Sequence, residues 1–427
     1  MTRNAVAPLE DARGQVTAPG NGPAPERRYR LAILASHVIQ YQDPLFKALG
    51  AHPAFDVEVF FCSDSGAKPY MDSGFGREVK WDIDLLQGYK FQFLRNLSRP
   101  GASGFWGAIN PQIVSKIRKG KFDALLVHGW ATCTIWAAIM AALVLKVPIL
   151  MRGDSNPLRP VPLWKRAMKK AVLVPLFKCI RGFLAIGTHN ANFYKGFGAP
   201  ENKIFLVPFA VNNAFFFAAA ERLRGSREAV RQRIGVPPGL PVILFCGKLS
   251  DVKRPLDLLT AFAPLQQEAS LVFVGDGPLK APLQEHVAKK DVRNVHFAGF
   301  KNQSELPEFY AAADIFVLPS EFEPWGLTVN EAMCFGLPVI ASDRVGAGGD
   351  LVKDRENGFI FPYGDVQQLA SLLATLVRDT ALRKQMADRS RAIIEHWSYD
   401  QDVEALAACL AAVAPRQETM STRNPSN

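Results

Sequence analysis

The stretch that decides the fold is ADIFVLPSEFEPWGLTVNEAMCFGLPVIASD, residues 313–343. Two apolar runs, residues 313–320 and 337–343, enclose a segment that we predict to be helical from about Leu327 to Phe335. Gly336 and Pro338 follow this segment, which is common after the last turn of a helix. A helix between two apolar strands is typical of a parallel sheet with crossover helices.

The same alternation of apolar and helical runs extends along most of the chain. Strand-like runs cover residues 29–36, 56–62, 122–129, 147–153, 182–187 and 204–209, then 241–249, 269–277, 294–300, 313–320, 337–343 and 358–361. The chain has 427 residues, too many for one ordinary core. We therefore predict an α/β fold with two Rossmann-like, doubly wound parallel-sheet domains that face each other across a cleft.

We place the boundary between these domains where the first series of strands stops. The first domain is expected at residues 29–211 and the second at residues 212–396, and a helix at about 397–413 is expected to pack back on the first domain. Polar residues rich in Pro, Gly and Ala predict disordered tails at residues 1–28 and 414–427.

Composition narrows the partners and the compartment. The net charge of +10 favours an anionic partner, which could be nucleic acid, a phosphorylated small molecule or a membrane surface. Six scattered cysteines without a CxxC pair favour a reducing compartment, and the first thirty residues contain no apolar signal segment. The longest apolar run, residues 131–145, is shorter than the roughly 20 residues of a membrane span. We expect a cytoplasmic protein.

Two carboxylates flank the start of the predicted helix at residue 327. The free N–H groups of residues 326–328 and the helix dipole would form an anion site at the end of the preceding strand. Glu331 lies one turn further on, where it could accept hydrogen bonds from a ribose, and Glu323 in the loop could reach the far end of the same ligand. The alternative is a capping box, in which Glu331 and Thr328 satisfy only the helix backbone.

Two lysines follow an earlier strand. Gly247 comes directly after the run at residues 241–246, and Lys248 and Lys253 lie in the loop beyond it. Two ammonium groups there could neutralise a diphosphate, or they could form a solvated pair with no ligand. The Gly-rich segment at residues 275–278 lacks the third glycine of a dinucleotide fingerprint and the GK[ST] of a P-loop, so we interpret it as a tight turn.

From about Pro241 to Asp365 the ordered series GKL, VGDGP, NVHFAGF, E-x7-E, EAMCFGLPVIASD and ENGFIFP resembles the nucleotide-sugar-binding domain of family 4 retaining glycosyltransferases, which have the GT-B architecture. The resemblance implies that Glu323 contacts the transferred sugar, that Glu331 contacts the ribose and that the two lysines contact the diphosphate. It implies no metal and no other cofactor. The donor-binding residues expected from the motifs and the resemblance are Gly247, Lys248, Lys253, Phe300, Glu323, Trp325, Gly326, Leu327, Thr328 and Glu331.

The first half of the chain is expected to bind the acceptor. His128 ends a predicted strand at a position where the family places a histidine near the reacting bond, although a hydrogen-bonded structural histidine is the alternative. The resemblance implies catalytic roles for Glu323, His128 and Lys253. Weaker acceptor-side candidates are His37, Arg152 and Asp154. The WDID sequence at residues 81–84 fits a DxD metal motif but does not end an apolar strand, so we set it aside.

The resemblance implies a retaining glycosyltransferase that moves a hexose from a nucleotide-diphosphate sugar, preferably a UDP-sugar, to an acceptor hydroxyl in polysaccharide or glycolipid biosynthesis. The acceptor would be a sugar, a polysaccharide or a lipid-linked sugar. Alternatives are a sugar-nucleotide epimerase, a catalytically inactive sugar-nucleotide-binding protein of the same fold, and a nucleic-acid binder suggested by charge alone, which we do not favour. The basic stretch at residues 163–183 would either lie on the inner face of an anionic membrane or form a solvated surface helix.

Overall fold

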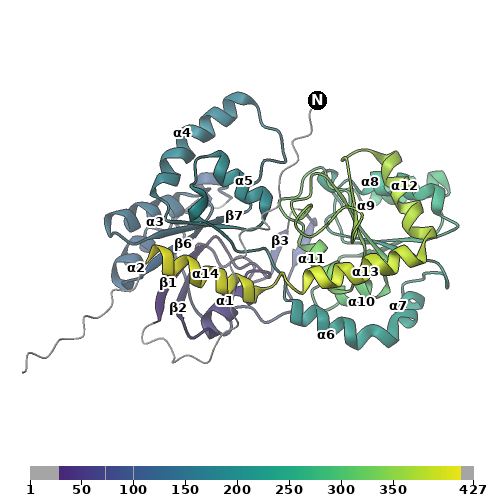
Figure 1. The fold of residues 1–427 in the computed structure, drawn as a ribbon, viewed down its shortest axis with the longest axis horizontal. Helices are drawn as coiled ribbons and strands as arrows, with labels where there is room; N and C mark the ends of the chain where they lie inside the picture. Colours follow the sequence, from purple (N-terminus) through teal and green to yellow (C-terminus); the bar gives the residue numbers. More distant parts are fainter. Residues whose placement is uncertain (1–27, 73, 100, 415–427) are drawn as a thin grey trace, which may run out of the picture.

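The computed structural model describes residues 28–72, 74–99 and 101–414. The predicted disordered tails, residues 1–28 and 414–427, lie outside the described residues except for Arg28 and Ala414. Two parallel sheets form the centres of the two lobes in Figure 1. This arrangement confirms the predicted α/β fold with two doubly wound sheets.

The first sheet has seven parallel strands in the order β5-β2-β1-β6-β7-β8-β9. Its strands are β1 (Tyr29–Ala35), β2 (Phe55–Phe61), β5 (Lys90–Phe93), β6 (Ala124–His128), β7 (Ile149–Gly153), β8 (Gly182–Ala185) and β9 (Ile204–Leu206). The connecting helices are α1 (Asp43–Ala51), α2 (Gln112–Gly120), α3 (Cys133–Val144), α4 (Leu163–Cys179) and α5 (Thr188–Gly196). Short 3-10 turns lie at Gly104–Gly107 and Glu201–Lys203.

The second sheet has six strands in the order β12-β11-β10-β13-β14-β15. They are β10 (Val242–Cys246), β11 (Ser270–Val274), β12 (Val295–Gly299), β13 (Ile315–Leu318), β14 (Val339–Ser342) and β15 (Gly358–Phe361). The helices are α6 (Asn213–Leu223), α7 (Arg227–Arg233), α8 (Pro255–Phe262), α9 (Lys280–Lys290), α10 (Leu306–Ala312), α11 (Leu327–Cys334), α12 (Val366–Arg378), α13 (Thr380–Ile394) and α14 (Tyr399–Val413). Further 3-10 turns lie at Arg224–Ser226, Asp251–Lys253 and Ala263–Leu265.

Each sheet is buried on both faces, which explains the nearly continuous apolar strands. Along β1, Leu31 and Ile33 belong to one buried cluster, whereas Ala32 and Leu34 belong to the cluster on the opposite face. Strand β10 divides its side chains between two clusters in the same way. Successive side chains of a strand point to opposite faces, so helices must cover both sides of such a sheet.

Most of the apolar run at residues 131–145 forms α3, which buries one side in the first domain and leaves Met140, Leu143 and Val144 exposed. Ile135, Ala138 and Ile139 are buried in the core of the first domain. Among the described residues, no helix combines the length and apolar character needed to cross a membrane.

Three strands were missed in the sequence. β5 adds to the outer edge of the first sheet, and the antiparallel hairpin of β3 (Tyr70–Asp72) and β4 (Arg77–Val79) stands apart from both sheets. These strands have three or four residues each and carry charged or exposed side chains. Their sequences lack the apolar run that identifies a central strand, because little of their surface is buried.

A buried arginine joins the C-terminal helix to the first domain. Although α14 follows α13 in the chain, it lies on the opposite lobe (Figure 1), where it packs against α1 and β9. Arg152, at the end of β7, forms an ion pair of 3.2 Å with Asp402 of α14, and both side chains are almost fully buried. The same guanidinium donates to the carbonyl oxygens of Val207 and Pro208. The expectation that Arg152 contacts an acceptor is therefore wrong.

Replacing Arg152 by Met should destabilise the protein by about 3–5 kcal/mol, because Asp402 would remain buried without its partner. The free energy of unfolding in urea measures this loss. Arg378→Met is the matched control, because Arg378 pairs with Glu268 at 2.8 Å on the surface and should matter little. Equal effects of the two substitutions would contradict the assigned importance of the buried pair.

Candidate functional site

The amino end of α11 carries backbone donors without partners. Gly326 precedes the helix with φ of 102°, and a Cβ atom there would lie 3.0 Å from Leu318 Cδ2, so the turn requires glycine. Within the part of the chain that the structure describes, the N–H groups of residues 326–328 donate no hydrogen bond. Leu327 and Thr328 are partly exposed. The positive end of the helix dipole and these donors can together hold an anion.

The capping-box alternative does not describe this helix. The residue before the first turn is Gly326, and no side chain caps the helix. Glu331 instead accepts a hydrogen bond of 2.6 Å from the Tyr310 hydroxyl group. Burial raises the pKa of the Glu331 carboxyl to about 7, although hydrogen bonds from Tyr310 and Gln303 act in the opposite direction. A carboxyl with this pKa changes its charge close to neutral pH.

Lys253 and Glu323 meet at the same place. Lys253 ends the 3-10 turn after β10, Glu323 follows β13, and the two side chains form an ion pair. Burial and, to a lesser extent, the Lys248 ammonium lower the pKa of Lys253 to about 8, whereas Cys246 acts in the opposite direction. The sequence assigned these side chains to different parts of a ligand, and the structure brings them into direct contact.

Glycines after β10 and β11 let two loops pack against each other. Gly247 has φ of 153°. A Cβ atom on Gly275 would lie 1.9 Å from the carbonyl oxygen of Gly247, and one on Gly277 would lie 2.5 Å from that of Leu249. The VGDGP segment is thus a tight turn, as predicted, and its glycines hold the loop that carries Lys248.

The β3–β4 hairpin of the first domain covers two of the predicted donor-binding residues. Asp72 Oδ1 and Oδ2 lie 2.8 and 3.0 Å from Lys248 Nζ. Phe75 packs edge-on against Phe300 with ring centroids 5.0 Å apart, and Arg77 lies 4.9 Å from the centroid of the same ring. Burial raises the pKa of Asp72, but Lys248 and two backbone N–H groups outweigh this effect and lower it. The ionised Asp72 carboxylate therefore contacts Lys248, which the sequence predicted to contact the diphosphate of the donor.

Sequence reasoning missed this hairpin and its contacts. The only local signal is the run DSGFGR at residues 72–77, whose glycines favour a turn. Nothing in that run indicates a partner in the other domain, because Lys248 lies 176 positions away in the chain.

Trp325 does not face a ligand. Its side chain is buried and stacks on Trp397 with ring centroids 5.4 Å apart. Its indole N–H donates to Asn330 Oδ1 at 2.9 Å. The expectation that this side chain binds the donor is wrong, because the ring is packed in the core. A tryptophan next to a turn can be buried in the core as readily as it can contact a ligand.

The histidines of the first domain have different surroundings. His128 ends β6, with Nδ1 3.5 Å from Gln42 Nε2, and its Nε2 is buried without a hydrogen-bond partner among the described residues. Burial and the Arg152 charge lower the pKa of His128 to about 3, so its imidazole is neutral at physiological pH. His37 is half-buried, with Nδ1 2.9 Å from Ser36 Oγ. Asp154 lies exposed beyond the end of β7.

The two domains contact each other through loops at the carboxyl ends of their strands. Thr188 donates to Asp350 from both its backbone N–H and its hydroxyl group, at 2.7 and 2.6 Å. Asn156 Nδ2 donates to the carbonyl oxygen of Pro324 at 3.0 Å. The loop that carries Glu323 thus lies at the inter-domain interface. In parallel sheets, ligands bind at this end of the strands.

The DxD-like sequence has a structural role. Asp82 accepts hydrogen bonds from the backbone N–H and the hydroxyl group of Ser304 in the second domain. Among the residues that the structure describes, no group of three or more His, Cys, Asp or Glu side chains could hold a metal ion.

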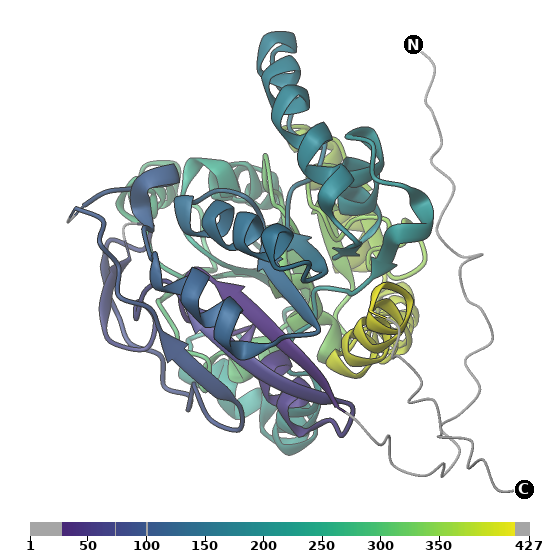
Figure 2. The ribbon, with the colours of Figure 1, turned by 90° about the vertical axis from the view of Figure 1, so that its left-hand side faces the viewer.

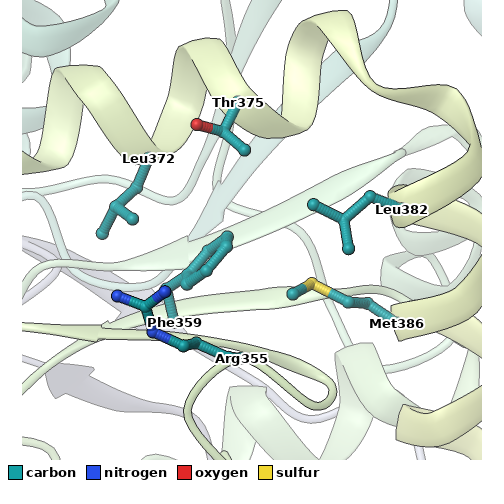
Figure 3. Close-up of a pocket in the computed structure, with 6 residues that line it drawn as sticks. All are labelled: Arg355, Phe359, Leu372, Thr375, Leu382 and Met386. Carbon is teal, nitrogen blue, oxygen red and sulfur yellow. The ribbon is translucent and has the colours of Figure 1, made fainter.

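An apolar hollow lies elsewhere in the second domain. Arg355 and Phe359 line one side, Leu372 and Thr375 of α12 the next, and Leu382 and Met386 of α13 the last (Figure 3). None of the residues expected from the sequence to bind donor or acceptor lines this hollow, so it is separate from the candidate site.

Comparisons with known proteins show what this chain is similar to. Residues 226–393 match the family described as Glycosyl transferases group 1. Sulfoquinovosyl transferase SQD2 of Arabidopsis thaliana is 29% identical over 312 residues, which cover 68% of this chain and 57% of that protein. A D-inositol 3-phosphate glycosyltransferase of Xylanimonas cellulosilytica is 29% identical over 231 residues, which cover 52% of this chain and 54% of that protein. The matched region thus spans just over half the length of these relatives.

Solved structures show the same fold. Anabaena Alr3699/HepE in complex with UDP has a TM-score of 0.69 to this chain at 19% sequence identity, over 90% of this chain and 100% of that one. At this identity the likeness shows the fold alone. The predicted resemblance to glycosyltransferases is confirmed at the level of group 1 for residues 226–393. The chain therefore has the GT-B fold, and residues 226–393 are similar to Glycosyl transferases group 1.

Proposed function

We propose that this protein transfers a sugar from a nucleotide-diphosphate sugar to an acceptor hydroxyl group. The observation that carries the proposal is the grouping at the start of α11. Its N–H donors, which have no described partner, lie with two lysines and Glu323 from neighbouring loops and with Glu331 of the helix itself. Such donors and cations suit a diphosphate, and a carboxylate one helical turn away suits a ribose diol. The match of residues 226–393 to Glycosyl transferases group 1 supports the same chemistry.

In this mechanism the second domain stabilises the leaving group. As the bond between the sugar and the diphosphate breaks, negative charge grows on the phosphate oxygens. The N–H groups of residues 326–328 and the ammonium groups of Lys248 and Lys253 oppose that charge. Glu323, paired with Lys253, would contact the sugar, and Glu331 would hold the ribose.

We further propose that the reaction retains the configuration at the sugar, as the resemblance to family 4 implies. The departing phosphate would help to deprotonate the acceptor hydroxyl on the same face. UDP is the favoured nucleotide, and a similar fold that binds UDP in Anabaena supports this choice. His128 is neutral and has a buried ring nitrogen without a described partner, so it would act as a hydrogen-bonding group rather than as an acid. Asp154 and His37 would lie on the acceptor side.

The first test is turnover. Wild-type protein incubated with UDP-sugars and simple sugar acceptors should release UDP and form an α-linked product, measured by chromatography and NMR. Glu323→Ala should lower kcat by roughly 100-fold or more while UDP still raises Tm. A control, Glu285→Ala on the surface of α9, should keep full activity. Binding of UDP by a wild type that turns over no donor would instead favour an inactive binding protein, and a β-linked product would contradict retention.

The contact between Asp72 and Lys248 must open before a diphosphate can bind that lysine. Asp72→Asn should therefore tighten UDP binding by about two- to fivefold, because the amide competes less well for the ammonium group. Calorimetric titration of UDP measures the change. Asp64→Asn is the control, since Asp64 pairs with Lys68 at 2.7 Å outside the site. Weaker binding by Asp72→Asn would mean that Asp72 assists the nucleotide rather than competes with it.

The raised pKa of Glu331 predicts a pH dependence of donor binding. Ionised Glu331 accepts hydrogen bonds from both ribose hydroxyls, so affinity should be complete above its pKa of about 7 and fall as pH drops through that value. Between pH ~8 and pH ~6 the ionised fraction falls about tenfold, and the affinity for uridine should fall with it. Glu331→Gln should bind weakly and without this dependence. An unchanged pH profile in the variant would assign the dependence to another group.

A further inference from the structure

Helix α4 extends away from the first domain for about half its length. Its last turns pack on the domain through Leu173, Leu176 and Phe177, which are buried. Every residue from Leu163 to Lys170 is exposed. The helix projects from the top of the left-hand lobe in Figure 1 and stands clear of the molecule in Figure 2. A solvated surface helix remains the alternative, and the distribution of apolar side chains along this segment bears on the choice.

The exposed part of α4 has two distinct sides. At 3.6 residues per turn, apolar residues occupy one half of the helix circumference and basic residues the other. The apolar half consists of Leu163, Trp164, Ala167, Met168, Ala171 and Val172, and the basic half of Lys165, Arg166, Lys169 and Lys170.

The apolar side faces away from the protein. The buried anchors Leu173, Leu176 and Phe177 fall on the basic side of the helix. In agreement, Lys169 Nζ lies 6.0 Å from the centroid of the Phe193 ring, on the neighbouring α5. The large apolar side chains point outward, with Leu163 83%, Met168 62% and Trp164 61% exposed. Such side chains at the tip of a projecting helix need an apolar surrounding.

The charge around this helix specifies its partner. No Asp or Glu occurs from residue 155 to residue 200. The same segment contains eight basic residues, namely Arg159, Lys165, Arg166, Lys169, Lys170, Lys178, Arg181 and Lys195. A polyanionic surface with an apolar layer beneath it would match both the basic residues of this segment and the exposed apolar side chains of α4. Nucleic acid offers no apolar layer, and a second copy of this segment would bring like charges together.

We propose that α4 docks this protein on an anionic phospholipid membrane. The helix lies in the plane of the interface, its apolar side enters the boundary between headgroups and acyl chains, and the flanking lysines contact lipid phosphates. This surface is separate from the donor site, so membrane binding needs no nucleotide and does not depend on the proposed function. It would bring a membrane-borne acceptor to the first domain.

The test is co-sedimentation of the full chain with vesicles. The wild-type protein should bind vesicles made of equal parts phosphatidylcholine and phosphatidylglycerol. It should bind much less to vesicles of phosphatidylcholine alone. The double variants Trp164→Gln/Met168→Gln and Lys165→Gln/Lys169→Gln should each lower partitioning by roughly tenfold or more. Matched controls are the exposed Val114→Gln on α2 and the double variant Lys289→Gln/Lys290→Gln on α9, which should bind like wild type.

Several outcomes would overturn the proposal. Absence of wild-type binding, equal binding to both vesicle types, or equal losses in the α4 variants and the controls would each exclude a membrane-docking helix. If the apolar variants instead abolish a dimer seen in solution by light scattering, the partner is a second copy. If duplex DNA displaces the protein from vesicles and binds it more tightly, the partner is nucleic acid. Unchanged Tm values measured without any ligand would show that all the variants are folded.

Discussion

The two-domain arrangement depends on one buried cation. Arg152 at the end of β7 binds Asp402 of α14 and the carbonyl oxygens of Val207 and Pro208, where the chain leaves the first sheet. One guanidinium thus joins three segments that lie far apart in sequence. The position of Arg152 at the carboxyl end of a strand suggested a ligand contact. Because both Arg152 and Asp402 are buried, however, each charge needs the other for the fold to be stable. Because α14 returns to the first lobe, the chain crosses twice between the domains.

The inter-domain interface is already occupied by protein at the proposed donor site. Asp72 places a carboxylate on Lys248, and Phe75 and Arg77 cover Phe300. A nucleotide bound as proposed would have to exchange these contacts for its own, so the hairpin and the donor would compete for the same cation and the same ring. The start of α11 differs from this covered region, since its N–H groups have no described partner. A nucleotide would then bind first at the open start of α11 and afterwards displace the hairpin from Lys248 and Phe300.

Prediction from sequence succeeded where the physical signal is local. The central strands were identified because both faces are buried, which requires long apolar runs. The turn at Gly326 and the tight turn at residues 275–278 were recognised from glycine and its neighbours. Hairpin strands β3 and β4 were missed because they are short and polar. Trp325 was assigned to the donor because its position in the motif gives no information about Trp397, its actual partner.

The sequence by itself determined the fold class, the resemblance of the second domain to glycosyltransferases and the positions of the candidate donor-binding loops, because periodicity and turn residues act over short distances along the chain. Only the tertiary structure decided which of those side chains remain available. It buried Arg152 and Trp325, paired Lys253 with Glu323 and placed Asp72 on Lys248. It also turned the apolar side of α4 outward. These outcomes depend on contacts between residues distant in sequence, which no local pattern encodes.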